Sequence, residues 1–324
     1  MSAFPQKQTN KLSTLVAITD PATRENTLQK WSAKGRNFIL GICTAIIILG
    51  VCYIILSPIF GIVSRAIMSP EDMANPLIFL IPQNFTLEHI QNAIIHMRYW
   101  GSLASTLMFA FGFSVVHVII TSMVGYGFAR FRFPGSNALF ALVIITIVVP
   151  VQAYMVPMFI NFRFFMGTNH ALTGTPWAML LLTLTGVGLR SGLYIYIFRQ
   201  FFRGLPKEIE EAAFIDGAGS LATFIKVMLP NAVPAIITVA LFAFVWHYND
   251  TFYTSLLWTG NDFLSTRLMT LGHTFENVAH VRNPLLVQMV VFAGVMLAIT
   301  PILTIYLFLQ RYFVEGLERS GIVG

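Results

Sequence analysis

Six long apolar stretches alternate with polar segments along this chain of 324 residues. Each stretch has hydrophobic residues on all faces and reaches the roughly 20 residues that a helix needs to cross a bilayer. In lipid the backbone must satisfy its own hydrogen bonds, as a helix does. The chain is therefore predicted to be an all-α, polytopic membrane protein with six transmembrane helices, at approximately 37–60, 100–128, 138–160, 176–199, 231–256 and 284–309.

The composition agrees with this prediction. Hydrophobic residues make up 56% of the chain and charged residues only 10%, against about a quarter charged in soluble domains. No small-residue cleavage site follows the first stretch, so we expect that stretch to be retained as a span. We therefore divide the chain into a polar tail over residues 1–36 and a membrane domain over residues 37–324. The two cysteines and seven scattered histidines lack metal-ligand spacing, so no metal site is expected.

The basic residues favour one side of the predicted membrane domain. With a cytoplasmic N-terminus, fourteen of the 20 lysine and arginine residues fall on the cytoplasmic side, five on the outer side, and Arg190 within a span. Because excess basic residues mark cytoplasmic loops, both termini are expected in the cytoplasm. The net charge of +6 is thereby explained without a nucleic acid partner. On the outer side, Thr86 is expected to precede a short surface helix.

The polar segment 204–230 separates the fourth and fifth stretches and carries four of the 14 acidic residues. Pro206 suits the first turn of a helix, and the glutamates that follow it favour the positive end of the helix dipole. Asp216 and Gly217 are expected to end this helix. A second helix, with Ser220 as its N-cap, is expected to bury one apolar stripe made of Leu221, Phe224, Ile225 and Met228. A solvated amphipathic loop has the same general pattern.

Several motifs resemble the permease subunits of ABC importers, in particular the carbohydrate-uptake permeases of the maltose-importer type. The triplet EAA at 211–213, then Gly217 after three residues and VMLP at 227–230 after nine more, is similar to their EAA loop. Valine at 227 is a mild departure from the family pattern. Further similar stretches are GYGFARFRFPGSNALF at 125–140, WHYNDTFY at 246–253 and QRYFVEGL at 310–317. The resemblance covers about residues 80–324 and implies the six-helix fold of a type I importer permease.

This resemblance also implies a function and partners. The chain would be a non-catalytic subunit of the bacterial inner membrane that moves a carbohydrate into the cytoplasm, and no cofactor is expected on it. Its partners would be a paralogous second permease subunit, two ATPase subunits that bind ATP and Mg²⁺, and an extracytoplasmic solute-binding protein. The ATPases would be separate chains, since this sequence has no G-x-x-x-x-G-K-[ST] loop. The residues implied in ATPase coupling are Glu211, Ala212, Ala213, Asp216, Gly217, Gln310 and Arg311.

Five residues are candidates for the substrate path: Arg190, Trp246, Tyr248, Asn249 and Asp250. Burying a charged side chain inside a membrane span costs free energy unless the charge is paired or hydrated. Arg190 therefore either faces a cavity, where it would meet an anionic sugar, or pairs with carbonyl groups in a structural role. The aromatic residues suit either a sugar or the aromatic belt at the membrane surface. The resemblance favours a carbohydrate substrate, and the overall similarity extends to importers of acidic saccharides such as alginate.

An ion-coupled secondary transporter of a small solute is the main alternative. Such a protein usually has more spans, internal repeats and carboxylates within the membrane, and this sequence has none of these features. A channel would need a polar filter, and a membrane enzyme would need clustered histidines and carboxylates. ATP dependence of uptake separates the importer from all three classes.

Overall fold

The computed structural model describes residues 21–168 and 170–319, with side chains described for residues 37–308, except 169, and for residue 310. The regular elements in the described part of the chain are helices joined by loops, with one isolated bridge between Met68 and Phe85. It forms two units that divide at Gly61. The helices are α2 (Pro21–Ile67), α3 (Pro70–Ala74), α4 (Glu88–His96), α5 (Tyr99–Arg130), α6 (Ser136–Val148), η1 (Val151–Ala153), α7 (Met155–Arg163), η2 (Phe165–Gly167), α8 (Pro176–Leu184), α9 (Ser191–Gly204), α10 (Lys207–Ile215), α11 (Ser220–Thr223), η3 (Phe224–Met228), α12 (Leu229–Asn231), α13 (Val233–Tyr248), α14 (Phe252–Leu257), α15 (Leu264–Ala279) and α16 (Pro284–Arg319).

Three described helices are long and apolar enough to cross a membrane. They comprise Asn37–Ile67, Tyr99–Arg130 and Pro284–Phe308, which match the first, second and sixth predicted spans. The expected boundary at residue 36 falls inside a helix, because α2 already begins at Pro21. Residues 1–20 of the predicted tail lie outside the described part of the chain.

The third, fourth and fifth predicted spans are broken in the structure. Pro150 ends the third, since proline lacks an N–H and turns Val149 to an extended ψ of 121°. The fourth is interrupted between α8 and α9, and the fifth between α13 and α14. The segment before α13 also bends by 81° against it. The prediction of single helices is wrong for these three, and the count of six spans stays a prediction.

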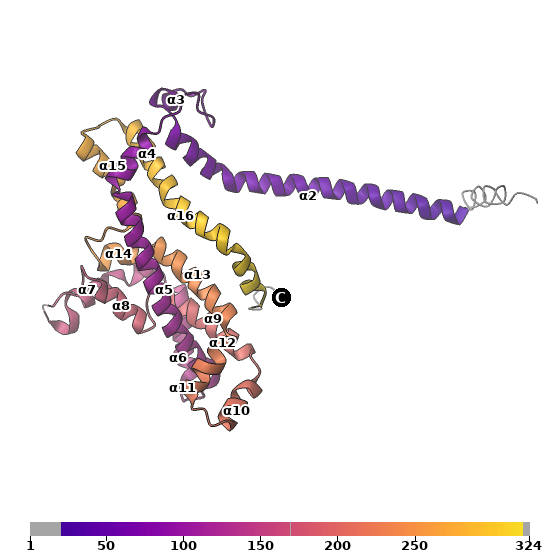
Figure 1. Ribbon diagram of the computed structural model, residues 1–324, viewed down its shortest axis with the longest axis vertical. Coiled ribbons are helices and arrows are strands. Elements are labelled where there is room, and N and C mark those ends of the chain that lie inside the picture. Colours follow the sequence, from indigo (N-terminus) through magenta and orange to yellow (C-terminus); the bar gives the residue numbers. More distant parts are fainter. Residues whose placement is uncertain (1–20, 169, 320–324) are drawn as a thin grey trace, which may run out of the picture. The chain divides into compact units, whose positions relative to one another are not determined.

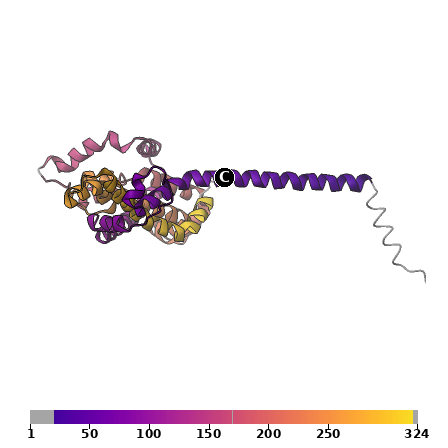
Figure 2. The same ribbon diagram turned by 90° about the horizontal axis from the view of Figure 1, so that it is seen from above.

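The second unit is built around α5, which packs against both α9 and α13 (Figure 1). Large aromatic side chains fill the space where these three helices meet η3, with Phe198 and Phe202 fully buried there. A separate apolar cluster joins α4, α15 and α16 at the other end of α5. The short helix α7, drawn in pink, lies along one edge of this unit (Figure 2).

The segment between α2 and α4 is fastened by one carboxylate. Asp72 accepts hydrogen bonds from the backbone N–H groups of Gln83 at 2.6 Å and Asn84 at 2.7 Å. The Asn84 N–H, with these other donors, holds the pKa of the Asp72 carboxyl below its ordinary value. The helix expected after Thr86 is confirmed as α4, where the Thr86 hydroxyl accepts from the N–H of Glu88.

Close contact between α5 and α9 depends on glycine. A Cβ at position 125 would lie 2.6 Å from the Cβ of Phe198 and 3.0 Å from the backbone nitrogen of Arg199. Gly125→Ala is therefore expected to lower thermal stability in detergent, since overpacking typically costs about 1–3 kcal/mol. Gly127→Ala is the matched control, because nothing lies within 4 Å of a Cβ there. Equal unfolding temperatures for both variants would contradict this contact.

Candidate functional site

The helix α10 forms much as its sequence predicts. It begins after Pro206 and ends at Ile215, with Gly217 in the left-handed conformation at φ 82°. The N–H of Ala218 donates to the carbonyl of Ala213, and the N–H of Gly217 donates to that of Phe214, both at 3.0 Å. This pair of bonds is the Schellman arrangement, which favours glycine at the position after the helix cap. The expected helix end at Asp216 and Gly217 is confirmed.

The exposed surface of α10 differs in part from the expected one. Glu211, Ala212 and Asp216 are exposed, whereas Ala213 is only 8% exposed and packs inside the chain. Ile215 is 86% exposed although its side chain is apolar, and Phe214 beside it is 43% exposed. The EAA motif does not single out Phe214 and Ile215, because apolar residues at these positions are ordinary in an amphipathic helix.

A buried polar network ties α10 to the end of α5. The hydroxyl of Tyr126 donates to Oε1 of Glu210 at 2.5 Å. Arg130 Nε lies 3.3 Å from Glu210 Oε2 as an ion pair, and Arg130 Nη2 donates to the carbonyl of Leu205 at 2.8 Å. The Arg130 and Glu210 side chains are 6% and 10% exposed. Glu210 therefore anchors the helix, while its neighbour Glu211 is free to meet another molecule.

The chain after α10 departs from the predicted second helix. Gly219, not Ser220, occupies the N-cap position, and α11 passes after Thr223 into the π-helix η3. Because a π-helix bonds residue i to i+5, side chains three apart no longer share one face. The predicted apolar stripe is accordingly split: Phe224 and Met228 are buried, and Leu221 and Ile225 are exposed.

The two coupling candidates near the C-terminus lie on α16. Gln310 is exposed on this helix. The side chain of Arg311 lies outside the described part of the chain.

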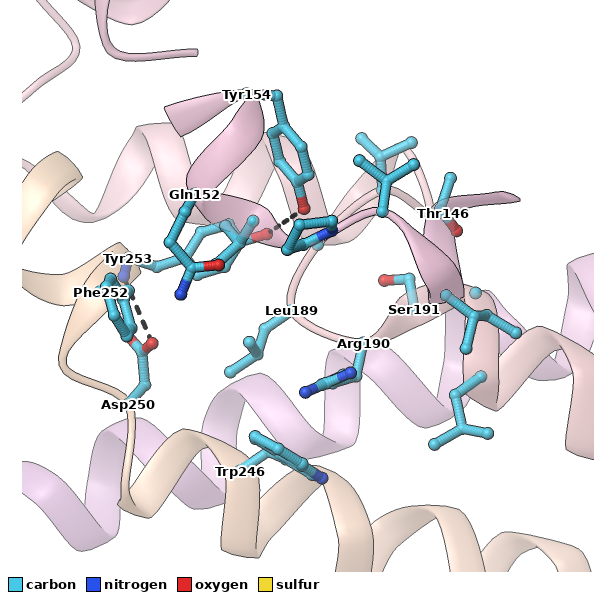
Figure 3. A pocket seen from close by; sticks show the side chains of 18 of the residues that line it. Thr146, Gln152, Tyr154, Leu189, Arg190, Ser191, Trp246, Asp250, Phe252 and Tyr253 are labelled. Atoms are coloured by element: carbon cyan, nitrogen blue, oxygen red, sulfur yellow. Dashed lines mark hydrogen bonds between the residues drawn. The ribbon is translucent and has the colours of Figure 1, made fainter. Parts of the chain in front are cut away.

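A cavity of about 750 Å³ opens where the three broken predicted spans meet. Its walls come from the end of α6, from η1, from the segment between α8 and α9, and from the α13–α14 junction (Figure 3). Each break supplies non-helical backbone, which is tolerated at membrane depth only where it is buried in protein or lines a cavity. The interruptions missed by the sequence prediction are thus what form this site.

Arg190 is the cationic group of the cavity. It was expected inside a span, but it lies in the break before α9 with a left-handed φ of 60°. Its guanidinium carbon lies 4.2 Å from the ring centroid of Trp246, and Figure 3 shows the group over the face of the indole. Such a cation–π contact is worth about 0.5–2 kcal/mol and leaves the guanidinium N–H groups free to bind an acceptor.

The other substrate-path candidates separate into two groups. Trp246, Asn249 and Asp250 line the cavity together with Arg190. Asp250 is mostly occupied in capping α14, because its carboxylate accepts from the N–H of Thr254 at 2.8 Å. Tyr248 lies away from the cavity, where its hydroxyl donates to the Ala298 carbonyl of α16 at 2.7 Å.

The sequence analysis missed two tyrosines of the cavity wall. The hydroxyls of Tyr154 and Tyr253 lie 3.0 Å apart and join η1 to α14 across the cavity (Figure 3). With Arg190 and Trp246 they give a lining of aromatic faces, hydroxyls and one cation. This chemistry binds a polar ligand by stacking and hydrogen bonding. In the part of the chain that the structure describes, no three His, Cys, Asp or Glu residues gather as a metal site.

Comparisons with known proteins place the chain among transport proteins. A family model described as "Binding-protein-dependent transport system inner membrane component" matches residues 117–319. The chain is 26% identical to the arabinooligosaccharides transport system permease protein AraQ of Halalkalibacterium halodurans, covering 85% of this chain and 93% of that one. It is 28% identical to the maltodextrin transport system permease protein MdxG of Bacillus subtilis, covering 87% and 96%. A solved chain from a bacterial ABC transporter involved in the import of the acidic polysaccharide alginate matches with a TM-score of 0.67 and 24% identity, covering 86% and 98%.

Proposed function

We propose, because this chain belongs to the family of binding-protein-dependent transport system inner membrane components, that it carries a carbohydrate across the inner membrane into the cytoplasm. As a permease subunit it is not itself an enzyme, and ATP hydrolysis takes place on separate subunits. Family membership also rules out the alternative of an ion-coupled secondary transporter. The relatives named for arabinooligosaccharides and maltodextrin support an oligosaccharide as the transported molecule.

The cavity supports an acidic oligosaccharide as the substrate class. A guanidinium held over an indole offers a carboxylate two directed N–H donors, while the aromatic surfaces suit the apolar faces of sugar rings. The volume of about 750 Å³ lies within the range of small-molecule sites. The position of Arg190 over Trp246 is the observation that carries this proposal.

The assembly in this proposal contains four kinds of chain. A paralogous second permease subunit completes the path, two ATPase subunits bind ATP and Mg²⁺, and an extracytoplasmic solute-binding protein delivers the saccharide. Both termini and the loop 204–230 lie in the cytoplasm, as the distribution of basic residues indicates. The alternating states of such a machine require an interface that differs between them.

The exposed face of α10 is the proposed contact with the ATPase. Glu211 supplies a charged contact, Ala212 permits close approach, and the apolar side chain of Ile215 enters the partner's cleft. Asp216 and Gly217 set the turn that presents this face. Ala213 supports the face from within, and Gln310 and Arg311 on α16 are further candidate contacts.

Removing the cation of the cavity is expected to weaken transport of an acidic substrate. In the complete transporter in proteoliposomes, Arg190→Gln should raise the KM for uptake of an alginate oligomer about tenfold or more. Uptake of neutral maltodextrin, if it occurs, should change little. Arg163→Gln is the matched control, because Arg163 is an exposed arginine of α7 outside the cavity. An unchanged KM in Arg190→Gln would overturn the assignment of the cavity to acidic saccharides.

A further inference from the structure

Two buried histidines lie behind the wall of the cavity, and the proposed function uses neither. His117 of α5 is 0% exposed and His247 of α13 is 1% exposed. Their ring centroids are 4.8 Å apart. The two rings therefore bring α5 and α13 into direct contact.

Hydrogen bonds fix the orientation of each ring. His117 Nδ1 lies 3.2 Å from the carbonyl of Phe113, and His247 Nδ1 lies 2.7 Å from that of Ala243. Since a carbonyl only accepts, both Nδ1 atoms carry a hydrogen. In the neutral ring with its hydrogen on Nδ1, Nε2 of His117 is an acceptor, and it lies 3.1 Å from the hydroxyl oxygen of Ser191.

His117 is coupled to the chain break that holds Arg190. Ser191 directly follows Arg190, so the bond from its hydroxyl fixes the end of the chain break against α5. The break is also pressed against the same ring, because a Cβ at Gly188 would lie 3.0 Å from His117 Nε2. His247 directly follows Trp246 on α13.

The left-handed backbone of Arg190 makes this support necessary. A non-glycine residue at positive φ is strained, and it persists where its surroundings hold it in place. The Ser191 hydroxyl and the backbone at Gly188 are held by one buried ring. Without these contacts to the His117 ring, the backbone between α8 and α9 can leave its strained conformation. The guanidinium of Arg190 would then no longer be held 4.2 Å from the Trp246 ring centroid.

We propose that His117 is a positioning residue, which sets the placement of Arg190 over Trp246 and thereby the affinity of the cavity for its saccharide. The effect on affinity rests on the proposed function, whereas the placement itself does not. Neither histidine touches the substrate, because neither lines the cavity.

The placement is tested by ¹⁹F NMR of the complete transporter labelled with 5-fluorotryptophan. The resonance of Trp246 is assigned by its loss in Trp246→Phe. Ser191→Ala and His117→Phe are each expected to shift this resonance, because both remove the bond between α5 and the break. Ser114→Ala is the matched control, since Ser114 is also a buried serine but bonds only to Ala110 within α5. An unmoved Trp246 resonance in both test variants, or an equal shift in the control, would overturn the proposal.

The consequence for affinity is tested by a double-mutant cycle on the KM for an alginate oligomer. His117→Phe alone should raise KM about tenfold, and it should add little in an Arg190→Gln background, since both act through the same guanidinium. Independent, additive effects would mean that His117 has only a general structural role. If Arg190→Gln leaves KM unchanged while the Trp246 resonance still shifts in His117→Phe, the proposed substrate class fails and the placement stands.

Discussion

Glu210→Gln is expected to destabilise the transporter and to uncouple ATP hydrolysis from uptake. The substitution leaves the guanidinium of Arg130 buried without its counter-charge, although its bond to the Leu205 carbonyl remains. Breaking one partner of a buried ion pair costs about 3–5 kcal/mol. The same change weakens the short bond from Tyr126, so α10 loses its fastening to α5.

The measurement combines thermal unfolding with the ratio of saccharide transported to ATP hydrolysed. Glu208→Gln is the control, because it removes an exposed carboxylate from the same helix two residues earlier. In an Arg130→Gln background, Glu210→Gln should cost much less than alone, since no buried charge remains to be paired. Equal behaviour of the Glu210 and Glu208 variants would show that the network has no special role.

Ile215→Asp is expected to release the ATPase subunits without unfolding the chain. Ile215 is 86% exposed, so a charge there meets water in the isolated subunit and costs the fold little. In a desolvated cleft the same carboxylate would be unpaired. A hot-spot residue at the centre of an interface contributes about 2 kcal/mol or more, which corresponds to more than tenfold in affinity.

Retention of the ATPase on purified transporter provides the readout. Leu77→Asp is the matched control, because Leu77 is an equally aliphatic side chain, 90% exposed, in the segment between α3 and α4. We expect the Leu77 variant to keep the ATPase and the Ile215 variant to lose it. Retention by both variants at wild-type affinity would exclude Ile215 from the contact.

The apolar pattern predicts the helical membrane fold but not its interruptions. Hydrophobicity reports how much of a segment avoids water, and it is high on both sides of Pro150 and on both sides of the break before Ser191. Whether a proline or glycine in a membrane segment is tolerated or ends the helix depends on the packing of neighbouring segments. The cavity is lined by these interruptions, so it cannot be predicted from the hydrophobicity of each segment taken separately.

In the segment 204–230, some features likewise follow from the local sequence and others depend on distant residues. The end of α10 at Gly217 follows from local backbone chemistry and is correctly predicted. The distinction between Glu210 and Glu211 is not local, because it depends on Tyr126 and Arg130, which are 80 or more residues earlier in the chain. The position of Tyr248 is also not local: it adjoins cavity residues in sequence, yet its hydroxyl bonds to the Ala298 carbonyl of α16.

The most direct test of the coupling role is site-specific photo-crosslinking in native membranes. A photoreactive amino acid is placed at position 215 at the end of α10 and, in a parallel sample, at position 77. Our account predicts that the position 215 sample forms a covalent adduct with the ATPase subunit and that the position 77 sample does not. An ATPase adduct from position 77, or none from position 215 in a transporter that still imports its substrate, would contradict it.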